Sequence, residues 1–539
     1  MFFSIILTGC GGNNIKTNSD KSLSKSEEQV LRVNFKAEPP DLNPQTTTDG
    51  VSMEILNAIS EGLLRNDPDG KIIEGLAKEY DISDDGTEYT FHLRDAKWSN
   101  GDKVTAYDFE YSWLRAITPE TASGYAFLFF GIKNAKPYFN GDIKDKSKVG
   151  IKAIDKKTLK ITLERPMGYF LALTTFPIYF PSNKAYVEKY GDQFASEKDK
   201  MVYCGPFKIS KWQHEHEIIL EKNSKYWDAD TVRLKRIEGV MISDSNTPVN
   251  MYKTEELDVT NVSTEFIDMF KDRKDFKSEV GSFVSYIAFN CNDKYFTNKK
   301  IRKAFSLAIN RDSFVNKLLN NGSLIARGFV PPSFPGKSGG DFREQNGDLV
   351  KDVSTEGKKG LKEANKLLDE GLKEIGATRE DLSEIRFLVD SSDEVKKLTQ
   401  SLQQMWKENL DVDINIEAVT YKIRLERMSR ADYQFALTRW GADYKDPMTY
   451  MDMWINGGMF FDVVNWTNKE YDKLINTAMI KLGDERMQAM LDAEKLLLKE
   501  MPITPIYFKA SNFLERPNVK GILRAPAQPT DYKWAYIEE

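Results

Sequence analysis

Late in the chain, a carboxylate follows directly behind an apolar strand and an indole. Residues 433–454 read YQFALTRWGADYKDPMTYMDMW. Phe435 and Leu437 alternate with their neighbours, which predicts a strand, and Trp440 and Asp443 come at its end. A buried carboxylate is costly unless a cation meets it. The spacing leaves two interpretations open: a turn or capping aspartate, which turn chemistry favours, or an anchor for a cationic group of a ligand.

Metal chemistry has little support in the sequence. The chain has three histidines and three cysteines, without the CxxC spacing of a zinc site and with too few cysteines for a disulfide scaffold. His214 and His216 alternate in KWQHEHEIIL, and we expect both on one face of a strand. Such a pair can bind a metal, but a polar strand face is favoured because no third histidine or cysteine is near. We expect no metal and no cofactor.

Ser338 is a candidate for hydrolase chemistry. Residues 336–340 (GKSGG) satisfy GxSxG, but that motif requires a strand before the serine and a helix after it. Here prolines precede it and Asp341 follows, which predicts a loop, and no histidine lies downstream of His216. There is also no GxxxxGK[ST] phosphate loop. We expect that the protein is not an enzyme.

Length and composition are typical of an ordinary soluble globular protein. The 539 residues are enough for more than one domain, and 40% are hydrophobic and 29% charged. The formal net charge of −6 gives no electrostatic case for binding nucleic acid or an anionic membrane surface. After the first ten residues, no apolar run approaches the roughly 20 residues of a membrane span.

The N-terminal residues resemble a secretion signal. The sequence LTGC, ending at Cys10, is similar to the lipobox of bacterial lipoproteins, in which the signal is cut before the cysteine and a diacylglycerol is attached to its sulfur. The apolar stretch before it is short and lacks a basic region. Residues 11–28 are rich in Asn, Ser and Lys, which predicts a flexible tether. We therefore expect an anchored extracytoplasmic protein.

Periodicity indicates an α/β fold. A strand is expected at LRVNF, from Leu31, and a helical apolar stripe includes Leu361, Leu368 and Leu372 and ends at Gly376. Strand, helix and strand signals then follow each other in residues 385–416. Such a βαβ unit predicts two parallel strands.

Several long motifs carry a family resemblance. They include LAKEYDISDDGTEYTFHLRDAKWSNGDKVTAYDFEYSWLRAITPETAS, IKAIDKKTLKITLERPMGYF, CGPFKISKW, NSKYWD and FTNKKIRKAFSLAINRDSFV, together with the stretch around Asp443. In register, over residues 31–536, they resemble the family 5 extracytoplasmic solute-binding proteins. Within that family the chain is most similar to the oligopeptide-binding lipoproteins of peptide ABC importers.

The resemblance implies a two-lobed, type II periplasmic-binding-protein-like fold with an additional inserted domain. Lobe I is expected to be discontinuous, and lobe II continuous. The expected boundaries are 1–10 for the lipoprotein signal, 11–28 for the tether, 29–60, 186–282 and 511–539 for lobe I, 61–185 for the inserted domain, and 283–510 for lobe II. The lobes would close around the ligand like a hinged jaw.

The resemblance also implies a peptide site. Asp443 corresponds to the aspartate that receives the α-ammonium group of the peptide. The residues implied to pair with the peptide backbone or to line side-chain pockets are Trp440, Gly441, Asp49, Gly50, Val51, Tyr125 and Tyr421. Four positions differ from the family member used for this comparison. Gly124 replaces a proline, Tyr421 replaces a pocket tryptophan, Leu437 replaces an arginine that would help to bind the peptide C-terminus, and Gly441 stands where a disulfide cysteine can sit. Cys204 and Cys291 are therefore expected to be unpaired.

The predicted function is a lipid-anchored receptor that binds extended oligopeptides and delivers them to an ABC permease. It is expected to act as a monomer, with Cys10 as the lipid attachment site. An alternative within the family is a receptor for another ligand, such as a dipeptide, a signalling peptide or a nickel chelate. A peptidase or lipoprotein hydrolase using Ser338 is the alternative from a different class.

Overall fold

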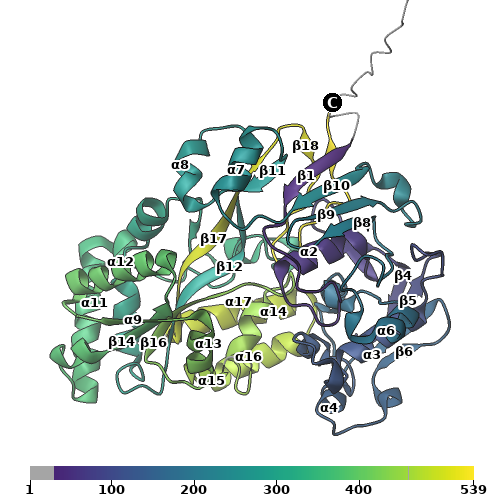
Figure 1. Cartoon of the computed structure of the whole chain (residues 1–539). Helices are drawn as coiled ribbons and strands as arrows, with labels where there is room; N and C mark the ends of the chain where they lie inside the picture. The colour runs from purple at the N-terminus through teal and green to yellow at the C-terminus, as the bar shows by residue number, and fades with distance from the viewer. Residues whose placement is uncertain (1–28, 459–460) are drawn as a thin grey trace, which may run out of the picture.

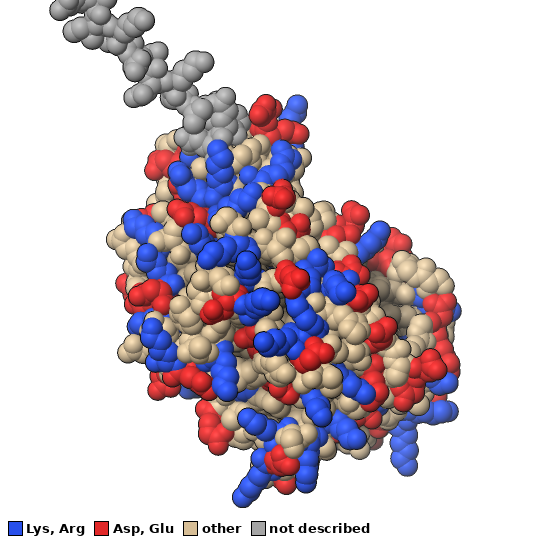
Figure 2. Space-filling view, turned by 90° about the vertical axis from the view of Figure 1, so that its right-hand side faces the viewer, with Lys and Arg blue, Asp and Glu red and all other residues tan. Residues whose placement is uncertain are grey.

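The computed structural model describes residues 29–458 and 461–539. Cys10 and the expected tether 11–28 therefore lie outside the described residues. Within the described ranges, no helix combines the length and the apolar character that crossing a bilayer requires. On the face shown in Figure 2, basic and acidic side chains are interspersed, and neither sign forms an extended patch.

One large mixed sheet extends through the molecule (Figure 1). Its strands lie in the order β15-β14-β16-β12-β17-β11-β1-β10-β9-β8, and β13 pairs with β17 beside this path. The strands are β1 (Val30–Asn34), β8 (Phe207–Gln213), β9 (Glu217–Lys222), β10 (Arg236–Val240), β11 (Val259–Asn261), β12 (Phe276–Phe289), β13 (Leu324–Ile325), β14 (Arg386–Asp390), β15 (Asn415–Val419), β16 (Phe435–Trp440) and β17 (Ile503–Glu515).

Strands β12 and β17 connect the two ends of this sheet. They pair antiparallel from Phe276 opposite Leu514 to Ala288 opposite Ile503, and the register shifts between Val280 and Val284. On one side of the pair lies β16, and on the other lies β11. A bulge bends a strand locally, so the two long strands form a bent connection between the two ends of the sheet.

The predicted βαβ unit is confirmed. Strands β14 and β15 are parallel and are joined by α12 (Asp393–Leu410). The second strand ends at Val419, beyond the predicted limit of residue 416. The helix predicted before this unit is α11 (Val353–Ile375), and Gly376 ends it in the left-handed conformation, with φ of 69°.

A smaller sheet lies in the N-terminal half, with strand order β4-β5-β7-β6. Its strands are β4 (Ala77–Ile82), β5 (Glu88–Leu93), β6 (Ile151–Ala153) and β7 (Thr158–Thr162), and α3 (Ala106–Ala116) packs against it. Along β5 alternate residues are buried, which places Phe91 and its neighbours in the core that also contains Trp113. The sheet therefore has one face covered by α3 and one face toward solvent.

The remaining elements connect these two sheets. The helices are α2 (Gly50–Ile59), α4 (Ala135–Phe139), α5 (Phe170–Leu173), α6 (Lys184–Tyr190), α7 (Asn246–Lys253), α8 (Ile267–Phe270), α9 (Lys299–Leu307), α10 (Phe342–Asn346), α13 (Tyr421–Ser429), α14 (Met448–Met451), α15 (Phe461–Val464), α16 (Lys469–Ile480) and α17 (Gly483–Glu500). The short strands are β2 (Leu64–Asn66), β3 (Ile72–Glu74), β18 (Val519–Lys520) and β19 (Tyr536–Ile537).

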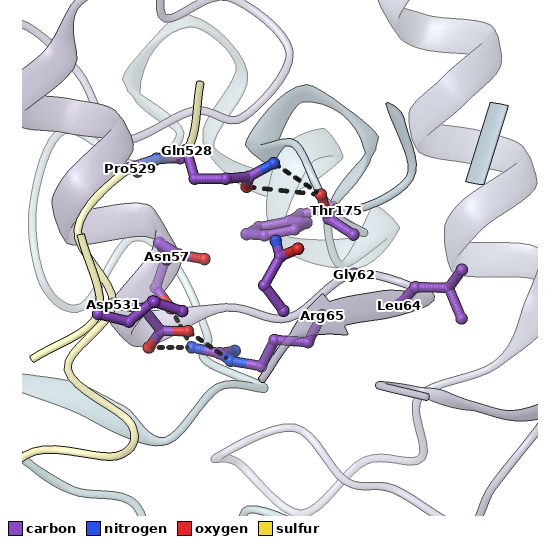
Figure 3. A pocket seen from close by; sticks show the side chains of 11 residues that line it. Asn57, Gly62, Leu64, Arg65, Thr175, Gln528, Pro529 and Asp531 are labelled. Carbon is purple, nitrogen blue, oxygen red and sulfur yellow. Dashed lines mark hydrogen bonds and ion pairs between the residues drawn. The ribbon is translucent and has the colours of Figure 1, made fainter. Parts of the chain in front are cut away.

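The C-terminal segment ties distant parts of the chain together at a small polar pocket (Figure 3). The Arg65 side chain on β2 donates through Nε and Nη2 to the two carboxylate oxygens of Asp531, at 2.8 and 2.7 Å. Beside it, the Gln528 amide lies 3.3 Å from the hydroxyl of Thr175. Because the Arg65–Asp531 pair is buried and bidentate, it fixes the end of the chain against β2.

The expectation for the histidine pair is wrong. His214 and His216 lie in the turn between β8 and β9, so they do not project from one face of a strand. The turn forms because Glu215 adopts a left-handed conformation, with φ of 58°. The His214 ring contacts the carboxylates of Glu38, at 2.7 Å, and Glu197, at 3.3 Å. Among the described residues, no group of three histidine, cysteine or acidic side chains could hold a metal ion.

Candidate ligand-binding site

Asp443 lies just beyond the C-terminal end of β16, an interior strand of the main sheet, as its sequence position predicts. Strand β16 ends at Trp440, whose indole Nε1 donates to the carbonyl oxygen of Thr449, at 2.9 Å. This bond closes the loop between β16 and α14. The backbone N–H of Asp443 lies 3.4 Å from the hydroxyl of the same Thr449. Both of these contacts to Thr449 hold the loop, and neither of them uses the Asp443 carboxylate.

A cavity of about 300 Å³ lies beside this loop. Its wall comes from two separate parts of the chain, residues 127–173 and residues 440–479. The lining residues are Phe127, Leu128, Gly131, Met167, Tyr169, Leu173, Trp440, Asp443, Tyr444, Thr449, Asp452, Met453, Ile455, Gly457, Gly458 and Met479. A concave, mostly apolar space with a few polar groups is typical of a small-ligand site.

The Asp443 carboxylate has no partner. Within residues 29–458 and 461–539, no cation forms an ion pair with it and no N–H or O–H donates to it, and α14 begins after Pro447 without it. Burial raises the pKa of Asp443 to about 6. The carboxylate therefore caps no helix, and it stands where a ligand cation would stabilise its charged form.

Asp49 and Tyr125 lie close to the same place. Burial, followed by the charges of Asp443 and Asp49, raises the pKa of the Tyr125 hydroxyl to about 12. Asp49 itself caps α2, because its Oδ1 accepts from the backbone N–H of Ser52 at 2.9 Å. The next residue, Gly50, faces open space, with no heavy atom within 4 Å of where its Cβ would be. The start of α2 thus presents exposed backbone near Asp443, and Val51 follows, partly buried.

Gly441 is required by a neighbouring ring. A Cβ at this position would come within 2.5 Å of the Phe283 ring, which lies in the irregular part of β12 and is 47% exposed. The side chain of Leu437, which lies in β16 and precedes Gly441, is buried. Cys204 and Cys291 are both free thiols, as expected.

Tyr421 lies apart from the cavity. It begins α13, is 56% exposed, and the Arg424 guanidinium lies 5.2 Å from its ring centre. It does not line the cavity beside Asp443. Its role as a pocket residue therefore stays a prediction.

Several cavity residues were not identified from the sequence. Tyr169 belongs to the quoted motif ending in PMGYF, and Tyr444 and Asp452 belong to the stretch around Asp443, but no role was assigned to them. The signal for Asp452 was present, since it is an acidic residue within the otherwise uncharged residues 448–454. Tyr169 could not be found in this way, because only the fold brings residues 127–173 against residues 440–479.

Comparison with known proteins identifies the family. The model of the bacterial extracellular solute-binding proteins, family 5, matches residues 71–461, most of the chain. The chain belongs to this family. Family 5 proteins are extracytoplasmic binding proteins of transport systems, and the protein is therefore not an enzyme. The surroundings of Ser338 are not those of a hydrolase nucleophile. Ser338 lies in a short turn, and its hydroxyl donates to the Asp484 carboxylate at 2.6 Å.

Two relatives in Bacillus subtilis (strain 168) align with the family 5 chain along almost its whole length. The dipeptide-binding protein DppE is 36% identical over 99% of this chain and 96% of its own length. The oligopeptide-binding protein OppA is 33% identical over 100% of this chain and 98% of its own length. The structure of Listeria monocytogenes OppA bound to peptide matches with a TM-score of 0.77 and 35% identity, over 95% of this chain and all of that one. The expected α/β, two-lobed type II fold is thereby confirmed.

Proposed function

We propose that this family 5 protein is an extracytoplasmic receptor that binds extended oligopeptides and delivers them to an ABC permease. The observation that carries the proposal is the partly buried carboxylate of Asp443, which lines a cavity and has no partner among the described residues. A free peptide α-ammonium is the cation that would complete it. The names of the similar proteins, which bind dipeptides or oligopeptides, support this ligand class.

The proposed binding mode is strand addition. An extended peptide would pair with the backbone of Trp440 and Gly441 on one side and of Asp49, Gly50 and Val51 on the other. Strand β16 ends at Trp440, and Gly50 at the start of α2 faces open space. Main-chain pairing serves peptides of any sequence. We assign Tyr125 to a side-chain pocket because burial and then the charges of both Asp443 and Asp49 raise the pKa of its hydroxyl. We assign Tyr421 to a more distant side-chain pocket.

Closure of two lobes would enclose the peptide. We propose lobe I as residues 29–60, 186–282 and 511–539, lobe II as residues 283–510, and the inserted domain as residues 61–185. The two lobes share β12 and β17, whose shifted register between Val280 and Val284 is a natural place for bending. On these boundaries, the inserted domain contributes Tyr169 and its neighbours to the wall beside Asp443.

The proposed setting is the outer face of the cell membrane. A lipid on Cys10, followed by the tether 11–28, would hold the monomeric receptor near its permease. Replacement of Cys10 by serine should release the protein into the culture medium and abolish incorporation of labelled fatty acid. An anchored and labelled C10S protein would refute this anchor while leaving the peptide site untouched.

The alternative is another ligand of the same family, such as a dipeptide, a signalling peptide or a nickel chelate. A dipeptide has its own support, since one similar protein is named for dipeptide binding. A nickel chelate has less support than a dipeptide, because the described residues contain no cluster of metal ligands.

Native mass spectrometry of the purified body, from about residue 26 onward, tests these possibilities. Ligand retained from the host would be released by denaturation, and a ladder of peptide masses is the expected result. A single non-peptide mass would overturn the peptide proposal. Empty protein is then titrated with a tripeptide and a pentapeptide, with and without an Nα-acetyl group. Binding of neither free peptide would refute it as well.

A further inference from the structure

A second carboxylate lies in the cavity beside Asp443. Asp452 begins the short helical turn Asp452–Trp454 and lines the same space. No other residue in the described part of the chain forms a hydrogen bond or an ion pair with its carboxylate. Burial, followed by the nearby charge of Asp443, raises the pKa of Asp452 to about 7. The cavity wall thus carries two carboxylates that form no ion pair with any described residue.

A buried arginine beside the cavity wall, over the ring of Tyr169, is already paired. Arg486 donates through Nη1 and Nη2 to the two carboxylate oxygens of Asp446, at 2.8 and 2.7 Å, and this buried pair is bidentate. Arg165 exerts only the weakest of the charge effects on Asp452. If a peptide α-ammonium neutralises Asp443, the negative charge of Asp452 is left without a counterpart.

The rest of the wall suits an aliphatic chain. Thioethers come from Met167, Met453 and Met479, and aromatic rings come from Phe127 and Tyr169. Methionine side chains adapt their shape to what they contact, and a long basic side chain buries its methylenes on such surfaces while its charged end seeks a polar partner. The cavity of about 300 Å³ is far larger than the roughly 30 Å³ share of one water molecule.

We propose that this cavity receives the first side chain of the peptide and that Asp452 selects a basic one, such as lysine, ornithine or arginine. The inference rests on the proposed peptide function, because the α-ammonium on Asp443 fixes which side chain enters. A peptide with a basic first residue brings two positive charges to two carboxylates. A peptide with a neutral first residue leaves one carboxylate to take up a proton or to stay charged and unpaired.

The test compares three synthetic pentapeptides that differ only in their first residue: lysine, Nε-acetyl-lysine and norleucine. All three keep the free α-ammonium, and the acetylated residue keeps the stem of lysine without its charge. Dissociation constants are measured by calorimetry on the wild-type protein near pH 7.5. We expect the lysine peptide to bind about tenfold tighter or more than either neutral peptide. Equal affinities would overturn the proposal without any variant being made.

Asp452→Asn locates the selectivity. The substitution keeps the shape of the side chain and removes its charge, so the affinity ratio between the lysine and norleucine peptides should fall toward one. Asp142→Asn removes an exposed carboxylate outside the cavity and should keep the wild-type ratio. A ratio that survives Asp452→Asn would overturn the assignment to this residue.

The failure of the proposed function has a different signature. If none of the three peptides binds, the peptide proposal itself is refuted, and the inference with it. If all three bind equally and Nα-acetylation abolishes binding, the α-ammonium site is upheld and only the selectivity of Asp452 is refuted.

Discussion

The rings of Tyr169 and Tyr444 stack face to face, with centroids 4.6 Å apart and planes inclined by 7°. Tyr169 comes from the proposed inserted domain, and Tyr444 follows Asp443 in the loop after β16. The guanidinium of Arg486 lies 5.6 Å from the centre of the Tyr169 ring and binds Asp446 in the same loop. The loop that carries the candidate anchor is therefore fixed against a distant part of the chain.

Loss of this stack should weaken both the fold and the site. Tyr169→Ala removes the ring, and aromatic pairs contribute about 0.5–1.5 kcal/mol beyond the area they bury. We expect a lower free energy of unfolding in urea and a weaker affinity for a free pentapeptide. Tyr169→Phe keeps the ring and serves as the control. An alanine variant that binds as tightly as the phenylalanine variant would show that the stack does not position the loop.

Removal of the Asp443 charge should have an effect that depends on the peptide N-terminus. Asp443→Asn should weaken binding of a free pentapeptide by about 2–5 kcal/mol, the scale for truncating a buried charge pair. The same variant should barely change the weak binding of the Nα-acetylated peptide, because that peptide has no cation to lose. Calorimetry on both proteins and both peptides completes a double cycle. Equal losses for both peptides would assign Asp443 a structural role instead.

The raised pKa of Asp443 predicts opposite pH effects on binding and on stability. In the empty protein the pKa is about 6, against 3.8 for the ordinary group, so the folded state binds the proton more tightly than the unfolded state. This contribution to stability is present below 3.8 and is lost as the pH rises through about 6. An α-ammonium requires the charged carboxylate, so peptide affinity should rise over the same window.

Calorimetry near pH 6 in buffers of different ionisation enthalpy should detect a proton released on binding. The window stays below the α-ammonium pKa of about 7.7–8.0, so the peptide remains charged. In Asp443→Asn, most of the dependence of peptide affinity on pH should be lost. The peptide used begins with norleucine, so that its first side chain forms no ion pair with Asp452. An affinity that is flat between about pH 5 and pH 7 would contradict the assignment of Asp443.

Gly441 should tolerate a side chain only when Phe283 is shortened. The Cβ of Gly441→Ala would meet the Phe283 ring at 2.5 Å, and such overpacking costs about 1–3 kcal/mol. The double variant Gly441→Ala, Phe283→Ala removes the clash and should recover part of the loss measured in urea. Additive losses in the double variant would show that the ring does not restrict this position.

Local patterns in the sequence predicted a large part of the fold. The stripe that ends at Gly376 and the βαβ unit were confirmed because periodicity and capping are set by neighbouring residues. The histidine pair was misplaced because alternation in HEH also fits a tight turn, and only the left-handed backbone at Glu215 distinguishes the two. The order of strands in the main sheet depends on contacts hundreds of residues apart, which no local pattern records.

The candidate site was predictable only where chemistry and strand position coincide. Asp443 could be singled out because a carboxylate behind an apolar strand requires an explanation, although its capping interpretation could not be excluded from spacing. The structure removes the capping role, because no N–H in the described residues donates to its carboxylate. Tyr169 and the Arg486–Asp446 pair escaped notice, since each is meaningful only once the distant segments meet.

The position of β17 has a consequence for the order of events during synthesis. This strand lies in the middle of the main sheet, between β12 and β11, yet it begins only at Ile503 of 539 residues. The two ends of the sheet therefore cannot be joined until β17 has been made, long after β11 and β12. Long-range pairing of this kind is slow, because chain entropy is lost before the contacts form. An emerging chain remains without its central strand until residues 503–515 arrive, so β11 and β12 each expose an unpaired edge until then.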